Sequence, residues 1–253
     1  MKIAVSGKGG VGKTTVSANL AKLFRKKGFN VYAVDADPDS SLGLALGIDE
    51  KQMESIKPII EMRELIEEKA GDGAFYMLNP LVNDVVDKFS VDVGGIKFLR
   101  MGGIKKGGSD CYCRENAFLK ALVNSLILDT KDVVILDMGA GIEHLTRGTS
   151  RGVDLMLIVT EPGKSSVQTA RIVEKLAREL EIKEIKFVAN KVRTEKEEAF
   201  VKQNFKEGEL VGIVHYDEAI SEKSMGIGQT PDEIDSGELE AVLNKAVKEA
   251  IEN

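Results

Sequence analysis

The stretch SGKGGVGKTT, residues 6–15, places four glycines and two lysines within ten residues. From Gly7 to Thr14 it fits the pattern G-x-x-x-x-G-K-[ST], and it lies between a short apolar run and an amphipathic segment. A strand before the pattern and a helix after it are the context that distinguishes a phosphate-binding loop from an ordinary glycine-rich turn. The chain is therefore constrained to an α/β arrangement in which a strand ends at a nucleotide phosphate.

Each part of this loop has an expected contact with bound ATP or ADP. Glycines let backbone N–H groups turn toward phosphate oxygens, and the N-terminus of the next helix adds the positive end of its dipole. Lys13 is expected to contact the β- and γ-phosphates, and the Thr14 hydroxyl to bind Mg²⁺, which prefers oxygen ligands. The residues expected to bind nucleotide here are Gly7, Lys8, Gly9, Gly10, Val11, Gly12, Lys13, Thr14 and Thr15.

Short apolar runs recur along the chain, each close to a glycine, serine or aspartate. Runs that are almost continuously apolar are typical of strands buried on both faces, as in a parallel sheet. Helical segments alternate with them, which predicts right-handed crossovers. The expected fold class is α/β, a P-loop NTPase with a mostly parallel, doubly wound sheet and helices on both faces. The strands are expected at residues 3–5, 31–34, 96–99, 133–136, 155–159, 185–189 and 210–214.

Four segments carry apolar residues at helical spacing. The first follows the glycine-rich loop and is expected to end at Gly28, because glycine commonly follows the last turn of a helix. The last, residues 237–253, has a polar face with more acid than base, which disfavours anchoring at a membrane surface. The expected apolar faces are Val16, Leu20, Leu23 and Phe24; Phe118, Leu119, Leu122 and Leu126; Ile172, Leu176 and Leu180; and, more loosely, Leu239, Val242, Ala246 and Ile251.

Length and composition favour a single domain over residues 1–253, since 43% hydrophobic residues can supply one substantial core. Residues 49–95 are richer in charge and are expected to form a less regular insertion. The net charge of −6 argues against nucleic acid or an anionic membrane as a partner. A cytoplasmic location is expected, because no apolar run approaches the roughly 20 residues that span a bilayer and the start lacks signal-peptide features.

Aspartates follow two of the predicted strands. Asp35 and Asp37 end the stretch VYAVD-AD, and Asp137 ends DVVILD. Ligands of open parallel sheets bind at the carboxyl ends of strands, so these carboxylates should face the phosphate loop. Asp35 and Asp137 are expected to support Mg²⁺ together with Thr14, Asp137 acting through water. Asp37 is the candidate for orienting the attacking water, whereas Asp39 is as readily a helix cap as a ligand.

Taken together, GKGGVGKTT, DADPD and DMGAG resemble the deviant Walker ATPases, a group that includes cell-division and plasmid-partition ATPases, the arsenical pump ATPase and the nitrogenase iron protein. In that family the early lysine reaches across a dimer that sandwiches two nucleotides. The resemblance implies that Lys8 contacts the phosphates of the partner, and it makes Lys8, Lys13 and Asp37 the expected catalytic residues. It also implies that Asn190, in FVANKV, binds adenine; without the resemblance, Asn190 is a turn residue after a strand.

The only two cysteines, Cys111 and Cys113, lie in GGSDCYCRENAF and are separated by one residue. Their polar neighbours argue against ordinary burial, and a disulfide between residues i and i+2 is strained. Metal ligation is favoured, with residues 109–114 as the metal-binding loop. One pair gives two of the four ligands that a tetrahedral zinc or square-planar nickel site needs, so two chains together would complete it. The expected metal is Ni²⁺ or Zn²⁺ bridging two protomers.

The same stretch, with DADPDSSLG and GIEHLTRGTSRGVD, resembles the CooC type of nickel-insertion ATPase, which matures carbon monoxide dehydrogenase. The resemblance implies a cytoplasmic homodimer that binds ATP and Mg²⁺, hydrolyses ATP slowly and helps to load nickel into the apo-enzyme. The residues themselves leave open an iron–sulfur carrier or reductase, an ATPase that positions DNA or membrane partners, and a non-hydrolytic binding module. His144 is favoured as a surface or packing residue over a metal ligand, and His215 is expected near the nucleotide or solvent.

Overall fold

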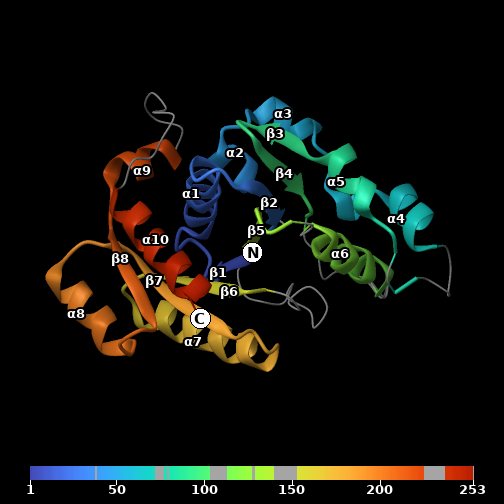
Figure 1. Ribbon diagram of the computed structural model, residues 1–253. Coiled ribbons are helices and arrows are strands. Elements are labelled where there is room, and N and C mark those ends of the chain that lie inside the picture. Colours follow the sequence, from blue (N-terminus) through green and yellow to red (C-terminus); the bar gives the residue numbers. More distant parts are fainter. Residues whose placement is uncertain are drawn as a thin grey trace.

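A computed structural model describes residues 1–37, 39–71, 77–78, 80–102, 113–126, 129–139, 153–224 and 237–252. Within these ranges the centre of the molecule is an eight-stranded sheet in the order β3-β4-β2-β5-β1-β6-β7-β8 (Figure 1). All neighbouring strands pair in parallel except β3, which is antiparallel to β4. The strands are β1 (Lys2–Gly7), β2 (Asn30–Ala36), β3 (Val91–Val93), β4 (Ile96–Arg100), β5 (Asp132–Met138), β6 (Leu155–Thr160), β7 (Glu184–Val192) and β8 (Leu210–His215).

Each of the seven predicted strands is present, and the α/β prediction is confirmed. Every residue of β1, β5 and β6 is buried, because these central strands are covered on both faces. Their apolar continuity therefore marks them clearly in the sequence. Strand β3 was not among the predicted strands. This strand has three residues, lies at the edge of the sheet and is only partly buried, so it carries little apolar signal.

Helices cover the sheet in two layers (Figure 1). The described helices are α1 (Lys13–Lys26), α2 (Leu42–Leu46), α3 (Glu50–Ser55), η1 (Ile59–Glu61), α4 (Arg63–Ala70), α5 (Asn83–Phe89), α6 (Cys113–Ser125), α7 (Lys164–Glu179), α8 (Glu195–Asn204), α9 (Glu218–Ser224) and α10 (Gly237–Glu252). Side chains of α1, α2, α3 and α10 pack in one hydrophobic cluster on one face. Side chains of α4, α5, α6, α7 and α8 pack in a second cluster on the other face. The sheet is thus doubly wound, as predicted.

The predicted apolar faces of α1 and of the helix around residue 118 are confirmed, because all eight of their residues are buried. The predicted end of α1 is confirmed as well. The last residue of α1 is Lys26, and Gly28 follows with a φ of 82°. This left-handed conformation, which favours glycine, lets the N–H of Phe29 donate to the carbonyl of Phe24 at 3.1 Å.

The predicted apolar face of α7 is wrong. Ile172 is 52% exposed and Leu176 is 37% exposed, while Leu180 packs only partly against the core. The helix lies against β6 and β1 through smaller side chains that repeat at the same helical spacing. Small residues let a helix approach a sheet closely, and the larger isoleucine and leucine are left on the outer surface. The apolar residues that α7 buries are Val167, Ala170, Val173 and Ala177.

Helix α10 lies against β8, the last strand of the sheet. Leu239 and Val242 are buried as predicted, and Leu243, which the sequence analysis did not include, is fully buried. The contact is close, because a Cβ added at Gly212 of β8 would lie 2.3 Å from a methyl carbon of Val242. Helix α10 therefore closes one end of the first hydrophobic cluster.

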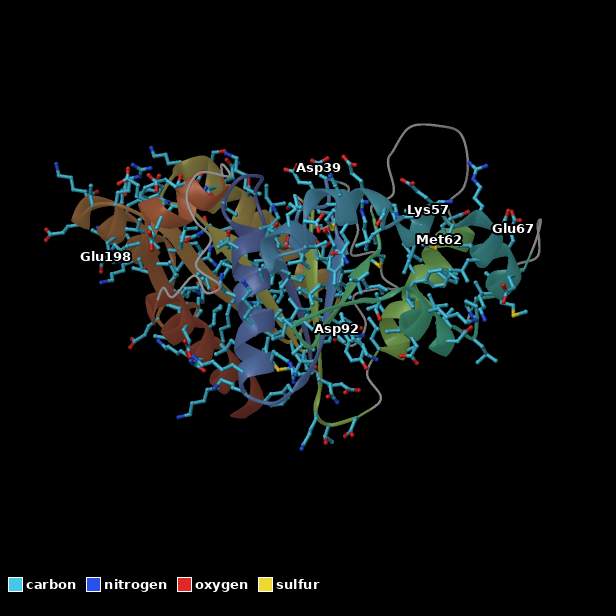
Figure 2. The ribbon with its side chains drawn as sticks, turned by 90° about the horizontal axis from the view of Figure 1, so that it is seen from above. Asp39, Lys57, Met62, Glu67, Asp92 and Glu198 are labelled. Carbon is cyan, nitrogen blue, oxygen red and sulfur yellow. The ribbon has the colours of Figure 1, made fainter. Side chains whose placement is uncertain are left out.

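Residues 49–95, predicted as a less regular insertion, supply α3, η1, α4, α5 and β3. Ile59, Ile66 and Val85 from this segment are buried in the same cluster as residues of α6. Its outer surface is charged, and Lys57 and Glu67 project from it (Figure 2). The shared core favours one domain over residues 1–253, which stays a prediction.

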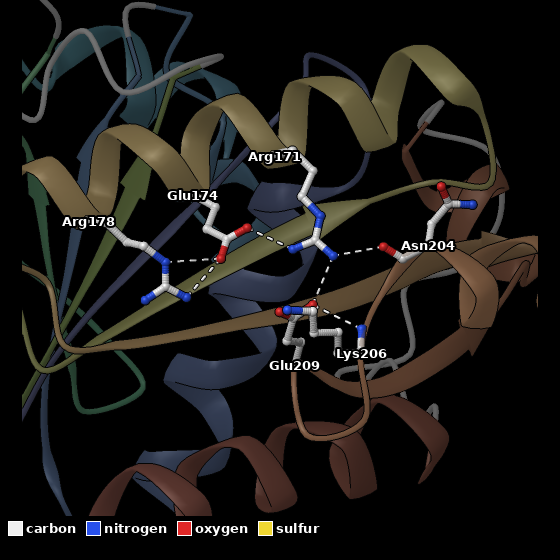
Figure 3. A network of polar contacts seen from close by, with 6 residues as sticks. All are labelled: Arg171, Glu174, Arg178, Asn204, Lys206 and Glu209. Carbon is white, nitrogen blue, oxygen red and sulfur yellow. Dashed lines mark hydrogen bonds and ion pairs between the residues drawn. The ribbon is translucent and has the colours of Figure 1, made fainter.

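A polar network around Arg171 joins α7 to the turn after α8 (Figure 3). Arg171 donates to the carboxylate of Glu209 at 2.8 Å and to the carbonyl of Asn204 at 2.7 Å. Its guanidinium carbon lies 4.9 Å from the ring centroid of Phe187 and 4.7 Å from that of Phe205. Charge-assisted hydrogen bonds and stacking on aromatic faces act together here. The network joins the middle of α7 to the end of α8 and to the turn that follows it.

Candidate functional site

A cavity of about 470 Å³ lies at the carboxyl ends of the parallel strands. Asp39 lies at this end of the sheet. Asp92, near the turn before β4, lies toward the opposite end, where the parallel strands begin (Figure 2). Open parallel sheets bind their ligands at the carboxyl ends of their strands. The cavity is lined by Gly9, Gly10, Gly12, Lys13, Thr14, Thr15, Val16, Asp37, Asp39, Ser41, Asn190, Lys191, Val214, His215, Tyr216, Asp217, Ile220, Ser221 and Leu239.

The loop between β1 and α1 leaves no space for side chains at two of its glycines. A Cβ at Gly7 would lie 2.2 Å from the carbonyl oxygen of Val159 on β6, and one at Gly12 would lie 2.3 Å from Nδ2 of Asn190. Both glycines also have positive φ angles, 151° and 95°. Gly12 directly precedes α1 and has no side chain to cap it, so the first N–H groups of the helix can bind an anion.

The two lysines of the loop point to different places. Lys13 is 7% exposed, lines the cavity and donates from Nζ to the carbonyl oxygen of Lys8 at 3.3 Å. The Lys8 side chain does not line this cavity; its Nζ donates to the hydroxyl of Ser165, in the first turn of α7, at 3.1 Å. Lys13 is therefore placed to serve a ligand in its own chain, while Lys8 projects beside that site.

Hydroxyl and carboxylate oxygens meet at the start of α1. The Thr14 hydroxyl donates to one carboxylate oxygen of Asp137 at 2.8 Å, and the Ser17 hydroxyl donates to the other at 2.8 Å. The hydroxyl oxygens of Ser41 and Thr14 are 3.2 Å apart. These are the oxygen donors that Mg²⁺ prefers, so the residues present fit this ion. Thr14 and Asp137 would hold Mg²⁺, directly or through water, and the ion would offset negative charge on bound phosphates.

Asp35 is fully buried beside Asp137, its register partner on the neighbouring strand. One of its carboxylate oxygens accepts from the N–H of Leu42 at 3.0 Å and the other from the N–H of Asp37 at 3.2 Å. Burial, followed by the charge of Asp137, raises the pKa of Asp35 to about 7 although these hydrogen bonds oppose the shift. Burial likewise raises the pKa of Asp137 to about 6. The contacts of Asp35 hold the turn after β2, and its predicted part in the metal shell stays a prediction.

Asp37 and Asp39 both line the cavity. A carboxylate oxygen of Asp37 accepts from the N–H of Asp39 at 3.0 Å, and the Asp37 carbonyl accepts from the N–H of Ser40 at 3.2 Å. The turn thus holds Asp37 at the wall of the cavity that the glycine-rich loop also lines. Asp39 is not the cap of the next helix, because Ser41 occupies the position before α2.

The raised pKa of Asp35 predicts a pH dependence of stability. The folded state binds this proton more tightly than the unfolded chain, so the free energy of unfolding should fall as pH rises from about 4 to about 7. Asp35→Asn should reduce the fall by an amount on the order of a few kcal/mol, because the neutral amide carries no buried charge. Urea unfolding at pH 5 and pH 8, with a chelator and without nucleotide, measures the difference.

The matched control for this measurement is Asp92→Asn. It changes an exposed aspartate at the end of the sheet opposite to the cavity. Its pH dependence should follow that of the unchanged protein. Asp137 still titrates in the Asp35→Asn variant, so a smaller fall is expected there rather than none. An unchanged fall in Asp35→Asn would show that Asp35 is not protonated preferentially in the folded state.

The far end of the cavity was largely missed by the sequence analysis. It is formed by the ends of β7 and β8, by the connection from β8 to α9, by α9 itself and by the start of α10. Asn190 and His215 line it, and their predicted places near a bound nucleotide stay predictions. The Asn190 amide donates to the carbonyl of Val11 at 2.9 Å, so it touches the glycine-rich loop itself. The lining residues that were not predicted are Lys191, Val214, Tyr216, Asp217, Ile220, Ser221 and Leu239.

The predicted metal loop, residues 109–114, falls mostly outside the described residues. Cys111 lies outside them, as do Gly141 and His144, while Cys113 is the first residue of α6. In the part of the chain that the structure describes, no three histidine, cysteine, aspartate or glutamate side chains gather as a metal site. No described helix is long and apolar enough to cross a membrane.

Comparisons with known proteins agree with this site. A family model described as the CobQ/CobB/MinD/ParA nucleotide binding domain matches residues 2–226. The carbon monoxide dehydrogenase accessory protein CooC of Rhodospirillum rubrum is 42% identical over 224 residues, which cover 87% of this chain and 85% of that protein. An uncharacterised ATP-binding protein of Methanocaldococcus jannaschii is 44% identical over 259 residues, with 98% of each chain covered.

Among solved structures, the septum site-determining protein MinD of Pyrococcus horikoshii, complexed with Mg-ADP, has the same fold. The TM-score is 0.66 at 23% sequence identity, and the match covers 98% of this chain and 94% of that one. At this level of identity the likeness concerns the fold alone.

Proposed function

We propose that this chain, which belongs to the CobQ/CobB/MinD/ParA nucleotide-binding domain family, is an ATP-driven metallochaperone that helps to insert nickel into apo carbon monoxide dehydrogenase. It is a P-loop ATPase of the CooC type, as the sequence predicts, and it binds ATP with Mg²⁺. The observation that carries the nickel proposal is the 42% identity, over most of both chains, to a protein named as an accessory to carbon monoxide dehydrogenase.

The proposed active form is a homodimer in which Lys8 serves the nucleotide of the partner. The placement of Lys8 supports this proposal, because its side chain lies outside the cavity of its own chain and beside α7. A cation supplied by a second subunit makes charge stabilisation at the phosphates depend on dimerisation. Release of Lys8 from Ser165 sacrifices one exposed hydrogen bond, which costs little.

Within each proposed site, the remaining groups act on phosphate and water. Lys13 and the N–H groups at the start of α1 bind the phosphates, and Thr14 and Asp137 hold Mg²⁺. Asp37, which lines the same cavity as the glycine-rich loop, orients the water that attacks the γ-phosphorus. ADP leaves with the bridging oxygen, and inorganic phosphate is the second product.

The turn after β2 is the proposed link between the nucleotide and the segment that carries the cysteines. Arg100, the last residue of β4, donates to the Ser40 hydroxyl at 3.1 Å. The next two N–H groups, of Met101 and Gly102, donate to the carbonyl of Asp35 at 3.0 and 3.1 Å. The chain therefore enters the stretch before Cys111 from a point held by the Asp37 turn. Movement of this turn with the γ-phosphate is the proposed means by which ATP changes the metal-binding loop.

The thiolates of two chains are the proposed nickel or zinc ligands, four in all. Thiolates also suit an iron–sulfur cluster, which is the alternative function that the Cys-x-Cys pair leaves open. The two functions differ in the protein as purified, because a thiolate-bound cluster gives a brown colour and absorbs broadly near 400 nm.

The test of the proposed function is reactivation of nickel-free carbon monoxide dehydrogenase. Incubation with this protein, Ni²⁺ and ATP should restore carbon monoxide oxidation faster than Ni²⁺ alone, and replacement of ATP with ADP should remove the gain. Reactivation that is no faster than with Ni²⁺ alone, in a preparation that hydrolyses ATP, would contradict the nickel proposal and leave the ATPase assignment intact. A brown preparation with a thiolate-bound cluster would favour the iron–sulfur function.

A further inference from the structure

The end of β7 carries an irregularity that faces the glycine-rich loop. Ala189 pairs with Ile213 on β8 and Val192 pairs with His215, so Asn190 and Lys191 together stand opposite a single residue. This is a β-bulge, a feature that redirects side chains and is common beside active sites. Both bulged residues line the cavity.

The backbone at Lys191 is strained. Its φ is 59°, a left-handed conformation that costs free energy in residues other than glycine. Such strain persists where the surroundings hold it, and it gathers at ligand sites. Residue preferences in turns do not explain a lysine at this position, since lysine is not favoured at positive φ. The contacts of the Lys191 side chain therefore have to account for this strained conformation.

The two bulged side chains bind two successive carbonyl groups of the glycine-rich loop. Lys191 donates from Nζ to the carbonyl oxygen of Gly10, and Asn190 donates from Nδ2 to the carbonyl oxygen of Val11 at 2.9 Å. The approach of Asn190 is so close that a Cβ at Gly12 would overlap its amide. The bulge thus holds the glycine-rich loop through two successive carbonyl groups.

Fixing a carbonyl also fixes the next N–H. In a trans peptide the C=O and the following N–H point in opposite directions within one plane. When the carbonyls of Gly10 and Val11 are held toward β7, the N–H groups of Val11 and Gly12 must point the other way. We propose that Lys191 and Asn190 are positioning residues that orient the amide donors of the glycine-rich loop toward the pyrophosphate part of any bound nucleotide, whatever its base.

This proposal rests on the nucleotide-binding part of the proposed function and assigns Asn190 a role different from adenine recognition. The two roles are separable by ligands that lack adenine. A residue that orients phosphate donors affects ADP, GDP and inorganic pyrophosphate alike. A residue that reads adenine affects ADP and leaves pyrophosphate unchanged.

Lys191→Met keeps most of the aliphatic side chain and removes the ammonium group. The dissociation constants of ADP, GDP and inorganic pyrophosphate, measured by titration calorimetry with Mg²⁺, should each rise by about tenfold, the loss expected for one charge-assisted hydrogen bond. Asn190→Ala should raise all three by a similar common factor. A rise confined to ADP in either variant would overturn the proposal and establish base recognition, and unchanged constants for all three in Lys191→Met would also overturn it.

The control is Lys186→Met, on the same strand. Lys186 also donates from Nζ to a glycine carbonyl, that of Gly208 at 3.0 Å, but it does not line the cavity. Its three dissociation constants should stay unchanged. Lys191→Arg keeps a cation within reach of the Gly10 carbonyl, so it should bind pyrophosphate within about threefold of the unchanged protein. Failure of arginine to restore binding, in a variant with the melting temperature of the unchanged protein, would refute the positioning role. None of these measurements needs nickel, dimerisation or hydrolysis, so their outcome is independent of the metallochaperone proposal.

Discussion

Lys8→Ala should abolish ATP hydrolysis while the protein still binds ATP. Lys13 and the N–H groups of the glycine-rich loop remain, and Lys8 does not line the cavity of its own chain. What is lost is the cation that the partner would receive at its phosphates. For a cation supplied in trans the expected loss of turnover is at least about a thousandfold. Phosphate release with Mg²⁺, together with the mass in solution with ATP, measures both effects.

A mixture of two inactive variants tests the trans arrangement directly. Asp37→Asn removes the group proposed to orient water and should also be inactive alone. In a mixed dimer, the site on the Lys8→Ala chain keeps its Asp37 and receives Lys8 from the Asp37→Asn chain. Random pairing in equal amounts should therefore restore about a quarter of the normal turnover. Lys164→Ala, an exposed lysine beside Ser165, is the control and should stay active. No recovery in the mixture would show that Lys8 acts within its own chain.

The phosphate end of the site was predictable because its chemistry is local. The pattern from Gly7 to Thr14 occupies consecutive residues, and Asp137 lies near the end of β5, a strand whose residues are all buried. Parallel strands bring such ends to one edge, so the meeting of Thr14 and Asp137 follows from the order of the elements. The sequence thus contains nearly everything needed to place these two residues together.

The far end of the cavity could not be predicted because it depends on register and on long-range packing. Lys191 reaches the loop only because a bulge displaces the pairing of β7 and β8. No residue type in this stretch predicts that bulge. Leu239 lines the cavity because α10 packs closely on β8. Both elements lie far along the chain from Lys13, so the sequence does not show that they reach the same cavity.

The error on α7 has a similar origin. Two sets of residues share the helical period, and the larger apolar set, with Ile172 and Leu176, gives the stronger signal by hydrophobicity alone. Contact with the sheet selects the smaller set, with Ala170 and Ala177, because the helix packs closely there. Periodicity therefore identified the helix, while close packing decided which of its faces is buried.

Cys111→Ser and Cys113→Ser should each abolish stoichiometric binding of Ni²⁺ or Zn²⁺. A serine hydroxyl is a much weaker ligand than a thiolate, and one thiolate per chain leaves the bridging site with two ligands of four. The unchanged protein should bind about one metal ion per two chains, as a site shared between two copies requires. Elemental analysis after dialysis, with the mass in solution measured in ATP and in ADP, gives the ratio.

The controls for the metal experiment distinguish loss of the thiolates from a change elsewhere in the loop and from a loss of nucleotide binding. Ser109→Ala changes a polar residue of the same loop and should retain the metal, and all three variants should bind ATP normally because the phosphate-binding groups lie on β1 and α1. A ratio of one metal per chain would contradict a bridging site even if the cysteines were required. Metal retained by both cysteine variants would place the ligands elsewhere. In the proposed site, two chains must meet to hold one ion. A subunit that stays monomeric with ATP and still carries the metal would therefore refute the proposed link between ATP binding and the metal site.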